Sequence, residues 1–217
     1  MRCREVREYY DMLSKKRAGL FLKRLFDIVM SLLLIIILSP LLLGLSIAVA
    51  VSSKGPVFYR QERVTKNLRT FRIFKFRSMV ADADRIGPLV TVENDPRITG
   101  VGRFMRKLRL DELPQLFNVL AGDMSFVGTR PEVVKYTDRY TNEILATLLL
   151  PAGVTSMASI MYKDEAELLE KADDADEVYV NKILPEKMRY NLEYLRTFSP
   201  GRDIKIMART LGAIARR

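Results

Sequence analysis

Residues 103–131 have the sequence RFMRKLRLDELPQLFNVLAGDMSFVGTRP, and we expect the rest of the chain to be organised around them. Basic residues lead into an adjacent carboxylate pair, Asp111-Glu112. Apolar residues then recur at helical spacing, which predicts one face of an amphipathic helix that ends at Gly122. A second basic point, Arg130-Pro131, follows a short apolar turn. The apolar residues of the expected helix are Leu113, Leu116, Phe117 and Leu120.

Two explanations fit the carboxylate pair. Neighbouring carboxylates bracketed by arginines suit a metal-bound phosphate substrate. Acids at the start of a helix are also favoured by the helix macrodipole alone, so the pair is weak evidence by itself. The basic residues on both sides favour the phosphate interpretation; they are Arg103, Arg106, Lys107 and Arg109 before the pair and Arg130 after it.

Composition narrows the chemistry. The 217 residues suffice for one ordinary domain with a sizeable core, and a net charge of +10 favours polyanionic partners such as nucleic acid, anionic lipid or phosphorylated substrates. One cysteine, Cys3, excludes an intrachain disulfide and a cysteine zinc site. The absence of histidine excludes Ser-His and Cys-His catalysis and His-ligated metals. Acid-base or nucleophilic chemistry must therefore use Asp, Glu, Lys, Tyr, Ser or that cysteine.

A membrane segment is expected near the N-terminus. Residues 28–53 contain no charged side chain, and this run of 26 residues exceeds the roughly 20 that a spanning helix needs. A cleaved signal peptide is the competing interpretation, since Ala48-Val49-Ala50 resembles a cleavage site. The run is longer than the about 7–15 apolar residues of a signal peptide, and it follows a charged leader.

Ser39-Pro40 lies near the middle of this run, where proline removes a backbone donor and bends or breaks a helix. Each half, of about 12–13 residues, would be about 18–20 Å long, too short for a hydrocarbon core of roughly 30 Å. Basic residues flank both ends, so the positive-inside rule places both ends on one side. A re-entrant helix and a kinked spanning helix remain open. The flanking residues are Lys23 and Arg24, then Lys54, Arg60, Arg63 and Lys66.

The next stretch, residues 54–77, carries eight basic residues and one acid, Glu62. Residues 57–59 and 71–76 are expected to be strands of a hairpin around the polar residues 65–67. Alternating aromatic and basic residues would suit a nucleic-acid surface. We favour a hairpin on anionic lipid, with some of its cations facing a phosphate substrate.

The remaining chain is expected to be mainly helical. A short acidic helix is expected to start at Asp82 and Asp84, a charged helix is expected to run from Glu132 to about Leu150, and residues 153–156 form either a ligand-contacting loop or a structural turn. The acidic run at residues 164–177 is expected to be a solvated surface without chemistry.

Two more helices are expected near the C-terminus. The first is opened by Pro185, and the second lies either in the core or on the membrane as a basic amphipathic helix. The first has Met188, Leu192 and Leu195 at packing spacing. The second has one apolar side, and its basic tail favours the membrane; that side consists of Ile204, Met207, Leu211 and Ile214.

The residues alone leave three classes of protein open. These are a membrane-bound phosphoryl-transfer enzyme using Asp111-Glu112, a membrane-anchored basic polyanion-binding protein without catalysis, and an interaction module in which the acidic pair only starts a helix.

Longer motifs favour the first class. They are Lys23-Arg24 with Asp27, Ser39-Pro40, Gly55-Pro56-Val57-Phe58, Arg60-Gln61-Glu62-Arg63, Lys75-Phe76-Arg77-Ser78-Met79, Asp95-Pro96-Arg97, Leu110-Asp111-Glu112-Leu113-Pro114-Gln115 and Gly122-Asp123-Met124-Ser125. With these motifs the chain, from about residue 20 onward, resembles the monotopic phosphoglycosyl transferases, bacterial sugar transferases that start glycan assembly on polyprenyl phosphate.

The resemblance implies the fold and its placement. It implies an α+β, mainly helical chain with a short β-hairpin, a membrane helix that re-enters at Ser39 and Pro40, and amphipathic interfacial helices. The implied organisation is a leader at residues 1–22, the re-entrant helix at 23–53 and a catalytic domain at 54–217. The catalytic domain would lie on the cytoplasmic face of the bacterial inner membrane.

The resemblance also implies a two-step reaction. Asp111 would attack the β-phosphate of a nucleotide diphospho-sugar, with UDP as the expected nucleotide, to form a covalent sugar-phosphate intermediate and release UMP. Polyprenyl (undecaprenyl) phosphate would then take the sugar phosphate, as the first membrane step of glycan assembly. Glu112, with Asp111, would hold Mg²⁺, while Arg106, Arg130 and Lys75 would hold phosphate oxygens.

The same resemblance implies binding partners, and the sequence differs from the family at two positions. The expected partners are the nucleotide diphospho-sugar, polyprenyl phosphate and membrane lipids, with no nucleic acid; a homodimer is left open. Thr129 stands where the family usually has proline, and Ser156 stands where many members have glycine. These differences bear on local rigidity and on the choice of nucleotide or sugar.

Overall fold

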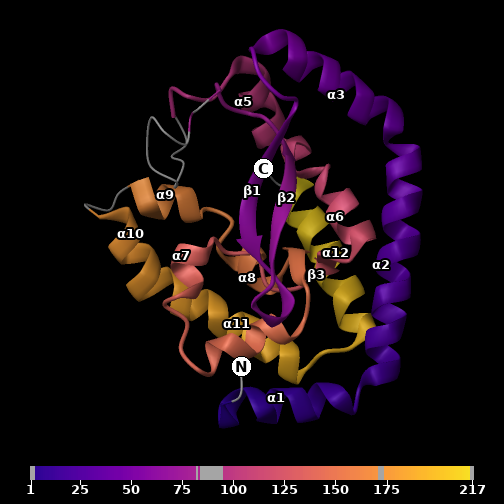
Figure 1. The fold of residues 1–217 in the computed structure, drawn as a ribbon, viewed down its shortest axis with the longest axis vertical. Coiled ribbons are helices and arrows are strands. Elements are labelled where there is room, and N and C mark those ends of the chain that lie inside the picture. The colour runs from indigo at the N-terminus through magenta and orange to yellow at the C-terminus, as the bar shows by residue number, and fades with distance from the viewer. Residues whose placement is uncertain (1–2, 82, 84–94, 171–173, 216–217) are drawn as a thin grey trace.

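The computed structural model describes residues 3–81, 83, 95–170 and 174–215. Helices surround a central antiparallel hairpin and a second, smaller sheet (Figure 1). The prediction of a mainly helical α+β fold with a short hairpin is confirmed. The expected acidic helix start at Asp82 and Asp84 lies outside the described residues.

The hairpin consists of β1 (Phe58–Val64) and β2 (Thr70–Phe76), joined by the short 3₁₀ turn η1 (Lys66–Leu68). Its register pairs Tyr59 with Lys75 and Arg63 with Phe71. Paired residues share a face of the sheet, and so do alternate residues along a strand, so Tyr59, Arg63 and Lys75 lie on one face. The predicted hairpin is confirmed, with strands somewhat longer than the first pattern indicated.

The second sheet pairs β3 (Met124–Val127) with β4 (Ala152–Thr155) in parallel. At its end the two backbones touch, because a Cβ on Gly153 would lie 2.2 Å from the Gly128 nitrogen. Residues 152–155 therefore form a packed strand, and the Ser156 side chain caps helix α8 (Met157–Met161) by accepting a hydrogen bond from the Ser159 nitrogen. Residues 153–156 therefore form a strand and a helix cap and not a loop, while a contact with a ligand stays a prediction.

Helix α1 (Arg4–Ser14) is part of the main core. Its buried residues Val6, Tyr9 and Leu13 pack in one cluster with Leu195, Phe198 and other residues of the C-terminal region. The Tyr9 hydroxyl also donates a hydrogen bond to Glu143 at 2.7 Å. The residues before the membrane segment thus form an ordered helix with one buried face.

Helices α2 (Arg17–Ile37) and α3 (Ser39–Ser52) meet at an angle of 64°. Among the described residues no single helix is long and apolar enough to cross a bilayer, whereas this bent pair together passes that test. The predicted break at Ser39-Pro40 is confirmed. The predicted half-length of about 12–13 residues is wrong for the first helix, which has 21 residues because it already begins at Arg17 in the charged leader.

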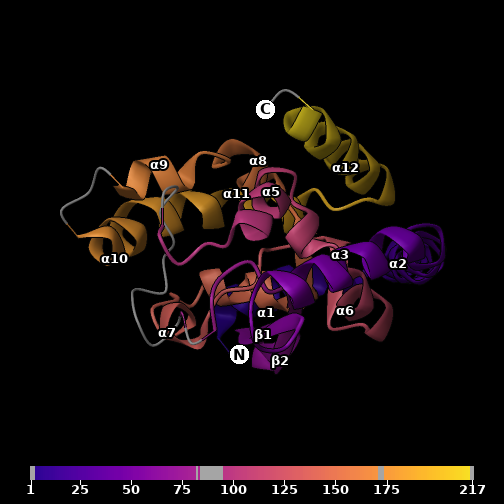
Figure 2. The same cartoon turned by 90° about the horizontal axis from the view of Figure 1, so that it is seen from above.

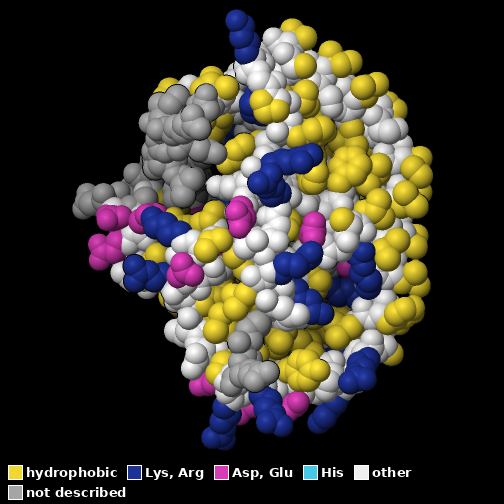
Figure 3. All heavy atoms as spheres, in the orientation of Figure 1, with side chains coloured by type: hydrophobic (Ala, Val, Ile, Leu, Met, Phe, Trp, Pro, Cys, Tyr) yellow, Lys and Arg dark blue, Asp and Glu magenta, His cyan; other side chains and the backbone are white. Residues whose placement is uncertain are grey.

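Helix α2 is polar toward the protein and apolar toward the outside. Lys23, Asp27 and Ser31, spaced four residues apart, are buried, and Lys23 is only 6% exposed. Lys23 lies 2.7 Å from Asp203 and donates to the Val127 carbonyl at 2.8 Å. Lys23 is therefore a packing residue and not the membrane-flanking cation that we predicted. Figure 3 shows hydrophobic side chains along the right margin of the molecule, where α2 and α3 lie in Figure 1. The exposed apolar residues of these helices include Phe21, Leu25, Val29, Ile36, Leu43, Ile47 and Val51.

The expected helix from Glu132 to Leu150 is wrong. The chain forms a single turn, α7 (Val134–Thr137), and then the 3₁₀ helix η3 (Ile144–Leu149). Thr141 starts the second turn, since its carbonyl and hydroxyl accept the Leu145 and Ile144 amides. Such local bonds compete with a continuous helix.

The acidic run contains α9 (Glu165–Glu170) and α10 (Ala175–Val178), while residues 171–173 lie outside the described part. It is less solvated than predicted, because Glu165 and Asp176 bind groups of the domain. Glu165 lies 2.9 Å from Lys187, and Asp176 accepts a hydrogen bond from the Tyr136 hydroxyl at 2.6 Å.

The C-terminal region contains the π-helix η4 (Tyr179–Ile183), α11 (Leu184–Arg196) and α12 (Pro200–Ala215). The buried residues Met188, Leu192 and Leu195 confirm the packing face predicted for α11. Of the two placements expected for α12, the core placement does not hold for Ile204 and Leu211, which are exposed, while Asp203 and Ile206 are buried. Figure 2 shows α12 beside α2, at the side of the molecule where the exposed apolar residues of α2 lie.

Gly102 allows α5 (Gly100–Lys107) to pack directly on the chain after β2. A Cβ at this position would lie 1.9 Å from the Ser78 carbonyl oxygen, whereas one at Gly100 would meet nothing within 4 Å. We expect Gly102→Ala to destabilise the fold by roughly 3 kcal/mol or more and to lower activity, because backbone must move. Gly100→Ala is the matched control. Thermal unfolding in detergent checks the pair, and equal melting temperatures would contradict the packing described.

Candidate active site

The carboxylate pair lies in a separate turn between two helices. Helix α5 is capped by Thr99, whose hydroxyl accepts a hydrogen bond from the Gly102 nitrogen at 2.9 Å. After α5, Arg109 adopts a left-handed conformation with φ 58° and directs the chain into the 3₁₀ turn η2 (Leu110–Glu112). A non-glycine residue in this conformation costs on the order of 1 kcal/mol. Because α6 (Gln115–Ala121) begins only afterwards, Asp111 and Glu112 are not in its first turn.

Helix α6 connects this turn to the hairpin. The Asn118 side chain donates to the Arg72 carbonyl at 3.0 Å and accepts from the Phe74 nitrogen at 2.8 Å. The predicted apolar face is only partly correct, since Leu116 is buried but Phe117 is 40% exposed. Polar Asn118 occupies the buried side because it satisfies the free edge of β2. The carboxylate turn and the strand that carries Lys75 are thereby held together.

The C-terminal end of α6 is fixed by two features. Gly122, with φ 91°, ends the helix as predicted. Arg24 of α2 donates to the carbonyl oxygens of Val119 and Leu120 at 2.7 and 2.9 Å, so it binds the last turn of α6. Cations favour a helix C-terminus, where carbonyl groups lack partners. Arg24 is therefore a structural contact of the membrane-proximal helix with the site.

Glu112 forms ion pairs with cations from three segments of the chain. Its Oε1 lies 2.7 Å from Arg130 Nη2, 3.1 Å from Lys75 Nζ and 3.6 Å from Arg109 Nη1. Burial alone would raise the pKa of Glu112, but the charges of Arg130, Lys75 and Arg109 outweigh burial and hold the pKa well below its ordinary value. Glu112 is consequently ionised and fixes the positions of these cations.

The cations respond to the same environment. The negative charge of Glu112 raises the pKa of Arg130. Burial lowers the pKa of Lys75, against the opposing effect of Glu112. Arg130 and Lys75 present N–H groups where a phosphate group can bind.

The Asp111 side chain is almost buried, but its carboxylate is not bound by other side chains that the structure describes. Within the described part of the chain its carboxylate forms no hydrogen bond and no ion pair. Burial raises the pKa of Asp111, and the neighbouring charge of Glu112 adds to that, against Lys75, Arg106 and Arg109. A carboxylate that is more basic than usual and not engaged by the protein is suited to nucleophilic attack.

The structure brings most of the predicted site residues together. Glu112, Lys75 and Arg130 are in direct contact, and Arg106 acts on Asp111 through its charge. Arg109 was missed as a site residue, although it stands two positions before Asp111 in the basic stretch. Ser39 and Pro40 are the first two residues of α3, directly after the break at Leu38.

The carboxylates fit a metal that is shared with substrate. Among the described residues no group of three His, Cys, Asp or Glu side chains forms a protein-only metal site. Mg²⁺ commonly uses one or two carboxylates together with substrate phosphates and water. Asp111 and Glu112 supply two neighbouring hard oxygen donors, and the bonds to Glu112 all use Oε1.

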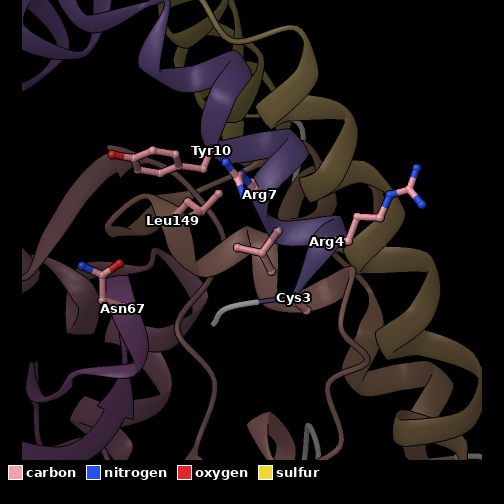
Figure 4. A pocket seen from close by; sticks show the side chains of 7 residues that line it. Cys3, Arg4, Arg7, Tyr10, Asn67 and Leu149 are labelled. Carbon is pink, nitrogen blue, oxygen red and sulfur yellow. The ribbon is translucent and has the colours of Figure 1, made fainter.

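A hollow of about 640 Å³ lies between α1 and the tip of the hairpin (Figure 4). Cys3, Arg7, Tyr10, Asn67 and Leu149 are among its lining residues. None of its lining residues belongs to the carboxylate and cation site, so we assign the chemistry to the site around Asp111.

Comparison with known proteins identifies the family. A family model described as bacterial sugar transferase matches residues 18–217, and the chain belongs to this family. The resemblance inferred from the sequence motifs is thereby confirmed.

Curated relatives carry different sugars in their names. The UDP-N-acetylgalactosamine-undecaprenyl-phosphate N-acetylgalactosaminephosphotransferase of Aeromonas hydrophila is 36% identical over 197 residues, covering 89% of this chain and 44% of the relative. The UDP-glucose:undecaprenyl-phosphate glucose-1-phosphate transferase of Escherichia coli is 38% identical over 195 residues, covering 88% and 39%. The undecaprenyl-phosphate galactose phosphotransferase of Salmonella typhimurium is 36% identical over 217 residues, covering 93% and 42%. The chain thus spans about two fifths of the length of these relatives.

Proposed function

We propose that the chain transfers a sugar-1-phosphate from a nucleotide diphospho-sugar, with UDP as the nucleotide, to undecaprenyl phosphate. The observation that carries the proposal is the unblocked, nearly buried Asp111 carboxylate beside cations that Glu112 holds in place. The undecaprenyl-phosphate substrates in the names of the relatives support the same class of reaction. The reaction would be an early membrane step in the assembly of a bacterial glycan.

The first step forms a bond between Asp111 and the sugar phosphate. A carboxylate oxygen of Asp111 attacks the β-phosphorus, the bond from that phosphorus to the bridging oxygen breaks, and UMP leaves with the electron pair. Lys75, Arg106 and Arg130 bind the phosphate oxygens and balance their charge. Arg130 can present a planar fork to a phosphate, which a lysine cannot do.

The second step returns Asp111 to its starting form. A phosphate oxygen of undecaprenyl phosphate attacks the phosphorus of the aspartyl sugar phosphate, and the carboxylate leaves. Mg²⁺ held by Asp111 and Glu112 would neutralise part of the diphosphate charge when bound. The protein keeps Glu112 ionised and the cations in place through both steps.

We propose that α2 and α3 form the re-entrant membrane anchor and place the site at the cytoplasmic surface of the inner membrane. The exposed apolar outer face of the pair and the buried polar inner face of α2 support this placement. A soluble helix would have the opposite arrangement. The exposed Ile204 and Leu211 of α12 support an interfacial contact beside it.

Residues on both sides of the anchor are expected to label from one side of the membrane. Tyr10 and Arg60 are exposed, and Cys3 is the only cysteine, so Tyr10→Cys and Arg60→Cys can be made in a Cys3→Ser background. An impermeant thiol reagent should label both positions only from the cytoplasmic side. Labelling of the two positions from opposite sides would contradict the re-entrant anchor.

The released nucleotide tests the proposed reaction. Purified protein with Mg²⁺, undecaprenyl phosphate and a panel of UDP-sugars should release UMP, and chelation of divalent cations should stop the release. Release of UDP would instead mean direct glycosyl transfer. A lack of turnover across the panel, together with salt-sensitive binding of nucleic acid, would favour the polyanion-binding alternative.

A further inference from the structure

Arg63 is a half-buried cation close to the site that the proposed mechanism does not use. It lies on β1, on the hairpin face that also carries Lys75. The neighbouring Val64 nitrogen donates to the Glu132 carbonyl at 2.9 Å, which fixes the strand beside residues 130–132. The Arg63 guanidinium itself donates to the Pro131 carbonyl at 3.2 Å, the residue directly after Arg130.

The guanidinium has more donors than the protein uses. Its other bond, from Nη2 to the Gln61 side-chain oxygen, is 2.5 Å long. Arginine has about five N–H donors, so several remain, including a buried Nε without a partner. Within the described residues no carboxylate lies within 4 Å of it. A buried N–H donor without a partner is costly unless something binds it.

The acid whose charge acts on Arg63 is Glu132, which has other partners. Glu132 accepts a hydrogen bond from the Tyr179 hydroxyl at 2.6 Å and lies 3.8 Å from Lys187. Lys187 in turn lies 2.9 Å from Glu165. Burial lowers the pKa of Arg63, Glu132 opposes this, and the charge of Arg130 adds to the lowering. Arg63 thus adds positive charge beside Pro131, the neighbour of Arg130, without an ion pair of its own among the described residues.

We propose that Arg63 is an additional substrate-binding residue that donates hydrogen bonds to phosphate oxygens held by Arg130 and Lys75. The inference rests on the proposed function, which brings a diphosphate and a lipid phosphate to this site. Phosphate oxygens are common to both substrates. A diphosphate is the favoured ligand, because it extends over two phosphorus centres and can contact Arg63 and Arg130 together.

Binding of inorganic pyrophosphate tests this site without turnover. Isothermal titration in detergent should show at least about tenfold weaker binding for Arg63→Gln, which corresponds to the loss of a charged hydrogen bond. Arg63→Lys keeps the positive charge but lacks the planar guanidinium, so its affinity for pyrophosphate should lie between those of wild type and Arg63→Gln. Arg72→Gln is the matched control, because Arg72 is exposed on the opposite face of the same hairpin and should bind within about twofold of wild type.

Kinetics separate the two phosphate sources. A rise in KM for the nucleotide sugar, with kcat little changed, identifies the diphosphate; a rise for undecaprenyl phosphate alone identifies the lipid phosphate. Either result supports Arg63 as a binding residue.

Unchanged pyrophosphate affinity in Arg63→Gln, or a fall in kcat alone, would overturn the proposal and leave Arg63 as a support for Pro131. If Arg63→Gln does not fold, Arg63→Lys is used, and affinity equal to wild type overturns the proposal. Pyrophosphate binding without UMP release would reject the proposed reaction while keeping this anion site.

Discussion

Asp111→Asn is expected to abolish sugar-phosphate transfer, lowering turnover by about 10⁴-fold or more, because an amide cannot replace the attacking carboxylate. Asparagine has nearly the same size, so the cations around Glu112 should keep their positions. UMP release from the nucleotide sugar measures the effect. Asp123→Asn is the control, since Asp123 pairs with Arg69 away from Glu112 and should retain activity. Transfer within about tenfold of wild type in Asp111→Asn would contradict a nucleophilic role.

The same substitution should not destabilise the protein. Burial raises the pKa of Asp111, so the folded state favours its protonated form. When the pKa of a carboxyl group is higher in the folded state than in the unfolded state, the protein loses stability as the pH rises from the unfolded pKa to the folded pKa. At neutral pH the charge of Asp111 therefore opposes folding. The side-chain amide in Asp111→Asn carries no charge, so the melting temperature should equal or exceed that of wild type. Loss of activity with unchanged or higher stability would separate catalysis from folding.

The pH dependence of wild-type turnover follows from the same group. Asp111 must be ionised to attack, and its pKa is raised by burial. Turnover at saturating substrate should therefore fall on the acidic side at a pH above the ordinary aspartate value of about 3.9.

Glu112→Gln is expected to cost both stability and activity. Without the carboxylate charge, Arg130, Lys75 and Arg109 would repel one another around a neutral amide. Removing one partner of a largely buried ion pair costs roughly 3–5 kcal/mol, and the partial exposure of Arg130 and Arg109 reduces this to about 2–4 kcal/mol. Turnover should fall by about 10²-fold or more, because the phosphate-binding groups move. Thermal unfolding and UMP release measure the two effects.

At low pH the wild-type protein should lose part of the stability that Glu112→Gln loses at neutral pH. The pKa of Glu112 is held well below its ordinary value, so its stabilising charge is fully present above the ordinary value and is lost as pH falls through the folded pKa. Glu112→Gln should lack this acid-dependent component. A double substitution with Lys75→Met should destabilise less than the sum of the single changes, since one repelling cation is gone. Additive effects, or a Glu112→Gln protein as stable as wild type, would contradict the organising role.

Much of the site was predictable because it lies in contiguous motifs. The carboxylate pair, the flanking arginines, the hairpin with Lys75 and the break at Ser39-Pro40 follow from residue type and spacing. Helical and strand periods, together with turn residues, indicated the hairpin and the end of α6 at Gly122. The grouping of Lys75 with Glu112 and Arg130 agrees with this part of the prediction.

Which face of an element packs was harder to predict. Helix α2 buries Lys23, Asp27 and Ser31 and exposes its apolar residues, so a rule that buries apolar faces selects the wrong side. Helix α6 likewise buries Asn118, because the partner of its amide is the backbone of β2. Arg63 could not be recognised either, since the number of its unused donors depends on contacts with distant Pro131. Periodicity contains no information about such pairwise contacts.

A trapping experiment tests most directly whether Asp111 is the nucleophile. The protein is incubated with a UDP-sugar that carries labelled phosphorus at the β-position, without undecaprenyl phosphate, and is then quenched and digested. We expect one hydroxylamine-sensitive label on Asp111 for each UMP released. The label should be absent from Asp111→Asn, and it should leave the wild-type protein when undecaprenyl phosphate is added. Transfer of the label to undecaprenyl phosphate with none ever found on the protein would contradict the account.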